Sequence, residues 1–355
     1  MVVSASSDYP RLTSLSHGGG CGCKIAPGVL SNLLSQLPKS QPYANLLVGN
    51  ETSDDAAVYK LNDSQALIAT TDFFMPVVDD PYHFGLIAAT NALSDIYAMG
   101  GTPIMALALV GMPINVLPHS VIAKVLEGGA HACSQAGIPV AGGHSIDSVE
   151  PIYGLAAMGL AHPNNIKRNN MAREGDVLVL GKALGVGVMS AALKKNMLDE
   201  QGYKAMIAST TQLNKPGATL GANNNVHAIT DVTGFGLLGH VLEIARASGL
   251  QANINFSDLP WLPEVPELAK QGFITGASGR NWESFGKHIN LDPELTPFAR
   301  DLLCDPQTSG GLLVACSPES VSQVLNIFHE QGMQSARVIG NLASRDNSYF
   351  VNVNA

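Results

Sequence analysis

The sequence predicts two domains of the α/β (α+β) class, and three observations support this. At about 150 residues per domain, a chain of 355 residues has room for two. From Ala56 onward, short apolar runs with strand character alternate with longer stretches of helical periodicity. The polar segment 164–176 interrupts this alternation, and a second cycle of strand, glycine turn and helix follows it. We therefore expect a domain boundary near residue 168.

Residues 1–48 are expected to form a mobile, glycine-rich arm, because Ser, Gly, Pro and Asn dominate them. One stretch, Pro27–Leu37, has apolar residues at helical spacing and predicts a helix. The first eleven residues lack the basic and apolar regions of a secretory signal, which favours a cytoplasmic protein.

The two domains are expected at 49–168 and 169–355. In the first, the patterns predict strands at 56–61, 65–72, 102–117 and 138–147, and helices at 82–99 and 118–136. The 102–117 run is the longest apolar stretch, but Pro103, Gly111 and Pro113 interrupt it and it is too short for a membrane helix. In the second, strand, acidic or glycine turn, and helix or strand recur at 176–188, 228–250 and 305–316.

The composition is that of a compact enzyme. Hydrophobic residues make up 46% of the chain and charged residues only 14%, which argues against disorder. The net charge of −9 leaves no general basic surface for a phosphate backbone, so we expect no nucleic-acid partner. Five cysteines, with Cys21 and Cys23 too close to bridge easily, indicate reduced thiols rather than a disulfide framework.

The most unusual segment is HGGGCGCK, residues 17–24. Its glycines allow the backbone to approach a ligand closely, and Lys24 beside Cys21 is expected to lower the thiol pKa. The alternatives to a reactive segment are a flexible tail whose two thiols have no function, or half of a binding site for a soft metal. The other cysteines are too scattered to complete a zinc site. We therefore interpret the segment as a reactive arm.

Carboxylates recur where predicted strands meet loops, and a further one lies on a predicted helix. Each alone would be read as a cap or turn former. Together they would repel one another unless a cation lies between them, and hard oxygen ligands favour Mg²⁺ with substrate phosphates. The pattern thus predicts a nucleotide site built on Asp54, Asp55, Asp72, Asp95 and Asp231.

Three glycine-rich turns, at 141–145, 181–187 and 233–239, could offer backbone amides to phosphates. None of them is specific. The second turn lacks the Lys-Ser/Thr ending of a P-loop, which argues against a P-loop nucleotide site. No GxGxxG motif is followed by a suitably placed acidic residue, which argues against a Rossmann dinucleotide site. We expect structural roles for His83, His131 and His240 and for the apolar-flanked Cys133, Cys304 and Cys316.

The motifs together resemble one family. LTSLSHGGGCGCK, SDDAAVY, TTDFF, NALSDIYAMGGTP, AGGHSID, ITDVTGFGLLGH and DPQTSGGLL occur in order from about residue 11 to 314 and resemble selenophosphate synthetase (selenide, water dikinase). The resemblance implies the two-domain aminoimidazole ribonucleotide synthetase-like fold, with the N-terminal sheet domain forming the core of a homodimer. It also implies synthesis of selenophosphate from ATP, hydrogen selenide and water, with release of AMP and orthophosphate. Several Mg²⁺ ions and an activating K⁺ would be required.

The resemblance also assigns residues. Cys21 and Lys24 match the family's essential cysteine and lysine, and Asp55, Asp95 and Asp231 match its magnesium ligands. ATP contacts would come from Lys24, Thr52, Ser53, Asp54, Asp72, Asp95, Gly143, His144 and Ser145. The segment Gly49–Asp55 is one residue longer than the family's Gly-Asn-x-x-Asp-Asp pattern.

Several alternatives stay open at this stage. Cys21 would either carry selenium as a perselenide or position selenide for attack, while Lys24 neutralises developing phosphate charge. Cys23 is expected to be structural or a backup thiol. The selenium source is either free selenide or a protein donor. Rival functions are an ATP-dependent small-molecule kinase of the same superfamily, which would release ADP, and a thiol-based selenium or metal carrier without turnover.

Overall fold

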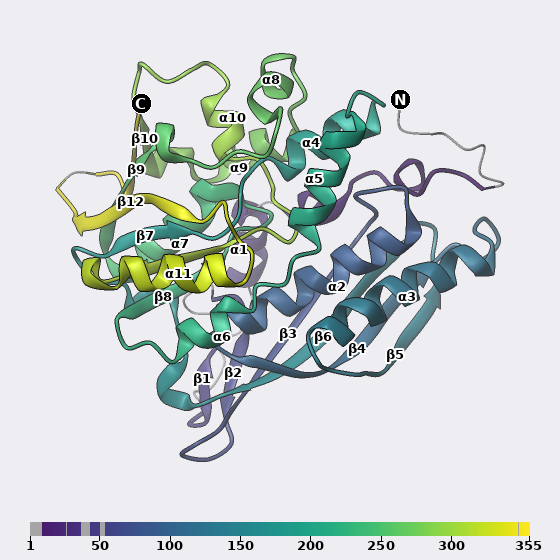
Figure 1. Cartoon of the computed structure of the whole chain (residues 1–355), viewed down its shortest axis with the longest axis horizontal. Helices are drawn as coiled ribbons and strands as arrows, with labels where there is room; N and C mark the ends of the chain where they lie inside the picture. The colour runs from purple at the N-terminus through teal and green to yellow at the C-terminus, as the bar shows by residue number, and fades with distance from the viewer. Residues whose placement is uncertain (1–8, 26, 37–42, 50–53, 347) are drawn as a thin grey trace.

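The computed structural model describes residues 9–25, 27–36, 43–49, 54–346 and 348–355. Two mixed sheets organise the chain, one from each expected domain (Figure 1). The predicted two-domain α/β (α+β) fold class is therefore confirmed. Among the described residues, no helix is long and apolar enough to cross a membrane.

The first sheet has six strands in the order β1-β2-β3-β6-β4-β5, all antiparallel except the β4/β5 pair. Its strands are β1 (Leu46–Val48), β2 (Ala57–Lys60), β3 (Ala66–Phe74), β4 (Thr102–Met112), β5 (Val140–Asp147) and β6 (Ile152–Ala161). Helices α2 (Pro81–Ala98) and α3 (His119–Gln135) lie side by side against one face (Figure 1). Strand β5 forms an exposed edge.

The second sheet has seven strands in the order β10-β13-β9-β12-β7-β11-β8. The strands are β7 (Val177–Leu180), β8 (Val226–Asp231), β9 (Leu250–Asn255), β10 (Ile289–Leu291), β11 (Leu312–Cys316), β12 (Arg337–Ser344) and β13 (Val351–Asn354). The helices of this half are α4 (Val186–Lys194), α5 (Glu200–Thr210), α6 (Pro216–Gly221), α7 (Gly236–Ser248), α8 (Val265–Lys270), α9 (Gly276–Phe285), α10 (Ala299–Leu303) and α11 (Val321–Glu330).

Helix α2 connects the two halves. Asp80 caps its start by accepting a hydrogen bond from the His83 amide, and Pro81 occupies the first turn, where a missing amide costs nothing. The helix packs on β3 and β6 on one side and on α5, α6 and β8 on the other, so polar residues along it are buried as well as apolar ones. This placement brings Asn91 and Asp95 to the junction of the two domains.

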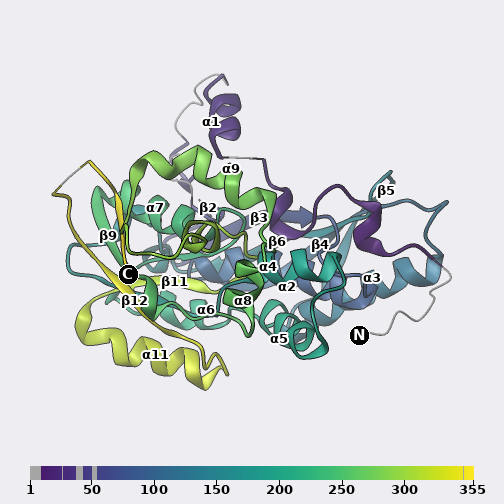
Figure 2. The ribbon, with the colours of Figure 1, turned by 90° about the horizontal axis from the view of Figure 1, so that it is seen from above.

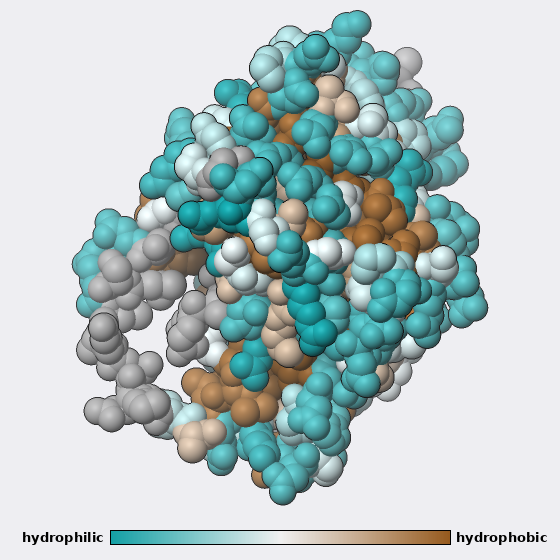
Figure 3. Space-filling model, turned by 90° about the vertical axis from the view of Figure 1, so that its left-hand side faces the viewer, coloured by the Kyte–Doolittle hydropathy of each residue, from teal (hydrophilic) through white to brown (hydrophobic). Residues whose placement is uncertain are grey.

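The N-terminal arm lies against the body at residues 9–25. Its Arg11 pairs with Asp79 at 2.7 Å, and the Thr13 amide and hydroxyl both donate to the same carboxylate. The expected helix forms as α1 (Pro27–Ser35), which projects beside α9 (Figure 2). The rest of the surface is largely hydrophilic on the side shown in Figure 3, with hydrophobic side chains in separate patches.

The expected glycine turn at 141–145 is wrong, because these residues continue strand β5 to Asp147. Gly142 and Gly143 adopt φ values of 144° and 154°, which L side chains rarely adopt, so the strand requires glycine at these two positions. A Cβ on Gly143 would overlap the Ala108 carbonyl of the neighbouring strand β4. The glycine therefore serves close strand pairing rather than a turn.

Close helix packing makes the first domain sensitive to a single methyl group. A Cβ at Gly128 of α3 would overlap the Tyr82 carbonyl of α2. We expect Gly128→Ala to lower the free energy of unfolding by about 1–3 kcal/mol, because the helices would have to move apart. Gly279→Ala in α9 is the matched control: its Cβ would meet open space, so stability should stay level or rise by about 0.5–1 kcal/mol. Urea denaturation measures both, and equal effects would contradict this packing.

Candidate active site

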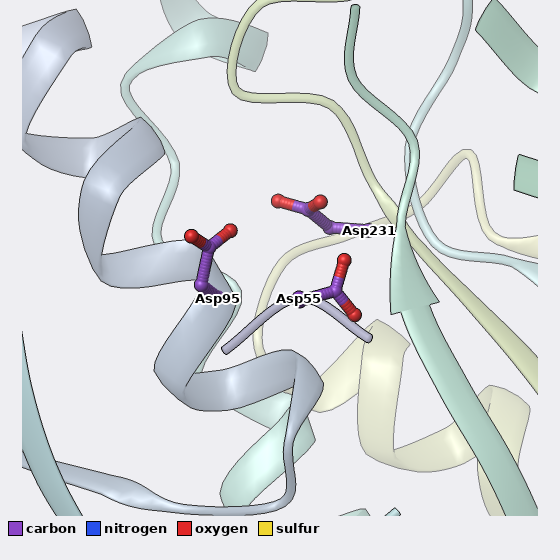
Figure 4. Close-up of side chains that lie close together, drawn as sticks. All are labelled: Asp55, Asp95 and Asp231. Carbon is purple, nitrogen blue, oxygen red and sulfur yellow. The ribbon is translucent and has the colours of Figure 1, made fainter. Parts of the chain in front are cut away.

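Three aspartates from both halves of the chain converge at the domain junction. Asp55 precedes β2, Asp95 lies on α2 and Asp231 ends β8. One carboxylate oxygen from each lies within 4.8 Å of the others, and the three side chains point into a common space (Figure 4). The sequence predicted these three as metal ligands, and the structure brings them together.

The cluster carries more negative charge than the protein around it neutralises. Burial raises the pKa values of Asp55 and Asp95, and repulsion from Asp231 raises them further. Burial also raises the pKa of Asp231, against a hydrogen bond from Ser94 that lowers it. Thr230 donates to Asp55 at 2.9 Å, yet Asp55 Oδ2 and Asp231 Oδ2 are buried without a hydrogen-bond partner among the described residues.

This donor set fits a hard divalent cation. Unpartnered buried carboxylate oxygens are costly unless a cation satisfies them, and an all-oxygen set selects Mg²⁺ over softer metals. Thr70 orients Asp95 from β3 through a 2.5 Å hydrogen bond. The residues present could therefore hold Mg²⁺ between the two domains.

Lys24 and Asp72 lie beside the cluster. Lys24 Nζ is 3.7 Å from Asp72 Oδ2, and the lysine side chain keeps 39% of its surface exposed. Burial acts to lower the lysine pKa, but the charges of the nearby carboxylates, Asp72 foremost, outweigh it, so the net effect raises the pKa. The ammonium group therefore stays charged at neutral pH and brings one positive charge to the carboxylates.

Cys21 of the arm lies in the 3₁₀ turn Gly20–Cys23, and its side chain is buried. Its amide donates to Thr308 Oγ1 at 3.1 Å, and its thiol donates to Asn91 Oδ1 at 3.1 Å. Gly20 has φ +54°, and a Cβ there would overlap the Thr308 hydroxyl. Only glycine allows the arm to lie this close.

The expected lowering of the Cys21 pKa is wrong for this arrangement. Burial and the Asp72 charge raise the thiol pKa well above its usual range, and Lys24 offsets them only in part. Cys21 is thus a protonated hydrogen-bond donor at neutral pH while the arm is closed. Cys23 is half-buried, and its pKa is also raised, mainly by burial.

Asn91 links the groups that the sequence treated separately. Its carbonyl oxygen accepts from the Cys21 thiol and from the Ser309 amide at 2.7 Å, while its amide nitrogen donates to Asp72. Ser309 adopts φ +52°, and its carbonyl accepts from the buried Lys182 ammonium at 2.9 Å. The sequence singled out DPQTSGG and the lysine-bearing glycine turn as motifs. The sequence did not indicate that residues of these two motifs fix the Asn91 side chain.

The glycine turn at 181–187 does not offer its amides to a ligand. Gln307 Oε1 accepts from the amides of Gly185 and Val186, and Asp305 Oδ2 accepts from those of Gly187 and Val188. Burial raises the pKa of Asp305 to about 7. The N-terminal amides of α4 are therefore satisfied within the protein, which overturns the phosphate-binding expectation for this turn.

The other expected nucleotide contacts fall on two segments of the chain, 52–54 and 143–145. Asp54 accepts a hydrogen bond from the Asn169 amide at 2.7 Å. Gly143, His144 and Ser145 lie on the edge strand β5, which β6 and β4 separate from the Asp72-bearing β3. Thr52 and Ser53 lie outside the described residues.

The remaining histidines and cysteines make structural contacts. The His240 ring stacks on Phe235 and pairs with Glu243, and His83 and His131 contact tyrosine hydroxyls. All five cysteines are free, and Cys133, Cys304 and Cys316 are buried, as expected.

Comparisons with known proteins agree with this arrangement. The family model for the AIR synthase related protein N-terminal domain matches residues 53–161, and that for the C-terminal domain matches residues 173–351. A selenide, water dikinase of Paraburkholderia xenovorans (strain LB400) is 65% identical over 339 residues, which is 96% of each chain. That of Rhizobium meliloti (strain 1021) is 59% identical over 335 residues, 94% of this chain and 96% of its own.

Solved structures share the fold at low identity. A thiamine-monophosphate kinase from Stenotrophomonas maltophilia K279a superposes with a TM-score of 0.61 at 20% identity, covering 94% of this chain and 96% of its own. A HypE-HypF complex chain gives a TM-score of 0.65 at 15% identity, covering 92% and 95%. The sequence matches cover a similar share of the chain at much higher identity, 59% and 65% against 15% and 20%. The chain belongs to the selenide, water dikinase family of AIR synthase related proteins.

Proposed function

We propose that this protein makes selenophosphate from ATP, hydrogen selenide and water, releasing AMP and orthophosphate. One observation carries the proposal beyond family membership. Cys21 and Lys24 of the arm meet Asp72 and Asn91 directly beside the aspartate cluster. A simple kinase would need the aspartates alone, and a thiol carrier would need the cysteine alone.

The aspartates are proposed to bind Mg²⁺ with the ATP phosphates. Asp55, Asp95 and Asp231 supply oxygens from both domains, so nucleotide binding would also fix the domains relative to each other. Bound Mg²⁺ would neutralise phosphate charge and orient the phosphoryl group. Thr52, Ser53, Asp54 and Asp72 are proposed as further ATP contacts. K⁺ is proposed as an activator on family resemblance alone, without assigned ligands.

Lys24 is proposed to stabilise negative charge that develops on the transferred phosphoryl group. Its raised pKa keeps it cationic, and its exposed fraction leaves the ammonium group able to reach a ligand. The closed arm excludes water around Cys21, which protects selenide from side reactions.

Cys21 is proposed to position selenide rather than to carry it. A perselenide on this thiol would require a two-electron oxidation of selenide, whereas the proposed reaction is redox-neutral and supplies no oxidant. The protonated thiol, held by Asn91, fits a positioning group. Cys23 is proposed to have a structural role.

A homodimer is proposed through the uncovered face of the first sheet. Because α2 and α3 cover only one face, large apolar side chains remain exposed on several strands, namely Tyr59, Phe73, Ile104, Met105 and Ile146. The exposed edge β5 is open to pairing with another chain. Strands lie about 4.8 Å apart, so β5 is three spacings from β3, and we propose that Gly143–Ser145 completes the nucleotide site of the other subunit.

The reaction can be tested by its products. We expect anaerobic incubation with ATP, Mg²⁺ and selenide to give a new phosphorus-selenium resonance in ³¹P NMR, with AMP and orthophosphate in equal amounts. A reaction without selenide is the control. Release of ADP alone would instead indicate a kinase, and bound selenium without turnover would indicate a carrier.

Asp231→Asn tests two properties of the aspartate cluster, namely its proposed role in Mg²⁺ binding and the destabilising repulsion among its carboxylates. We expect Mg²⁺-dependent turnover to fall at least about 100-fold, because one anionic ligand is lost. Without metal, the variant should be more stable than the parent by about 1 kcal/mol, because repulsion among buried carboxylates is relieved.

Thermal unfolding with and without Mg²⁺ measures this change in stability. Asp63→Asn, on the exposed surface, is the matched control. A metal-free Asp231→Asn protein no more stable than its parent, with undiminished turnover, would exclude the cluster as the metal site.

Cys21→Ala tests the arm. We expect selenide-dependent turnover to fall about 100-fold or more, because the group that holds the nucleophile is removed. Cys23→Ala, two residues away and outside the Asn91 contact, should stay within about twofold of the parent. Initial anaerobic rates measure both, and unimpaired Cys21→Ala would rule out a role for this thiol.

A further inference from the structure

A cavity of about 330 Å³ lies against the arm, and the proposed reaction does not use it. We name it the outer pocket. The arm, α4, α9 and the loop before β11 enclose it, through His17, Gly18, Lys194, Arg280 and Thr308 among others.

The outer pocket is cationic in an acidic protein. The chain has 29 acidic and 20 basic residues, yet Lys194 and Arg280 line the pocket and no acidic side chain among the described residues does. His17 is paired with Glu150, and Arg280 donates to the Gly22 carbonyl. Lys194 has no ion-pair partner in the described part of the chain. The pocket therefore favours a small anion.

The outer pocket adjoins the reactive thiol. Thr308 lines the pocket and accepts the hydrogen bond from the Cys21 amide. Gly18, Gly19 and Gly22 form the remaining wall on the arm side, and the Cys21 thiol is buried behind it. A small shift of this glycine wall would join the pocket to the thiol.

The two sides of the arm differ in the charge of the groups around them, so they favour different ligands. The inner side faces Asp72 and the aspartate cluster, which repel an anion that arrives without a metal ion. Hydrogen selenide is the hydroselenide anion at neutral pH, so it would approach more readily from the cationic outer side.

We propose that the outer pocket is the docking site of the hydroselenide anion, from which it passes to Cys21 when the arm shifts. This inference rests on the proposed function. It assigns Lys194 and Arg280 to recognition of the selenium substrate, separate from the groups that hold ATP.

Lys194→Gln tests the docking site, with Lys195→Gln as its matched control. Lys195 is the next residue, but its ammonium lies over the Phe273 ring, 5.3 Å from the centroid. We expect Lys194→Gln to raise KM for selenide about three- to fivefold and to leave KM for ATP and the saturated rate unchanged. Lys195→Gln should leave all three unchanged.

Ala191→Phe tests the cavity without altering charge. Ala191 lines the outer pocket, and a phenyl ring there would occupy part of it. We expect KM for selenide to rise, with a circular dichroism spectrum like that of the parent. If the phenyl ring of Ala191→Phe prevents folding, Ala191→Leu is used in its place.

The outcomes separate the two proposals. Selenophosphate synthesis by the parent with unchanged selenide KM in Lys194→Gln and in the cavity variant would overturn the docking site alone. Equal increases in KM for ATP and selenide would also overturn it, because they would reflect general attraction of anions. A parent that makes no selenophosphate would overturn the docking site together with the proposed function.

Discussion

Three carboxylates held within 4.8 Å of one another are the constraint on which the rest of the site depends. Burial and mutual repulsion raise their pKa values, so the protein alone holds this arrangement at a cost. Because Asp55 and Asp95 come from one domain and Asp231 from the other, cations that relieve the repulsion also bind the domains together. The electrostatics of the domain junction therefore fit the proposed site for ATP with Mg²⁺.

Asn91 carries this constraint to the arm. Its side chain connects the Asp72 carboxylate to the Cys21 thiol, and the Ser309 turn, held by Lys182, fixes its orientation. The Cys21 thiol and the Asp72 carboxylate therefore cannot move independently while the arm is closed. The outer pocket and the aspartate cluster both adjoin the arm, so the proposed docking site would keep the two anionic substrates apart until they react.

Local pattern predicted the two-domain class, most strands and both helices of the first domain, and the aspartates at strand ends, because periodicity and turn chemistry act over short stretches of chain. Predictions from local pattern were wrong where contacts between residues far apart in the sequence determine the structure. Gly142 and Gly143 resemble a turn but continue strand β5, and the 181–187 amides are taken by Asp305 and Gln307, which lie far away in sequence. The raised pKa of Cys21 follows from burial, which the adjacent Lys24 could not reveal.

The most direct test of this account is to locate the metal itself. Crystals grown with Mn²⁺ and a non-hydrolysable ATP analogue would show the ions by anomalous scattering. The account predicts peaks between Asp55, Asp95 and Asp231, with the analogue's phosphates on the same ions and near Lys24. Metal peaks elsewhere, with these three carboxylates still uncompensated, would contradict it.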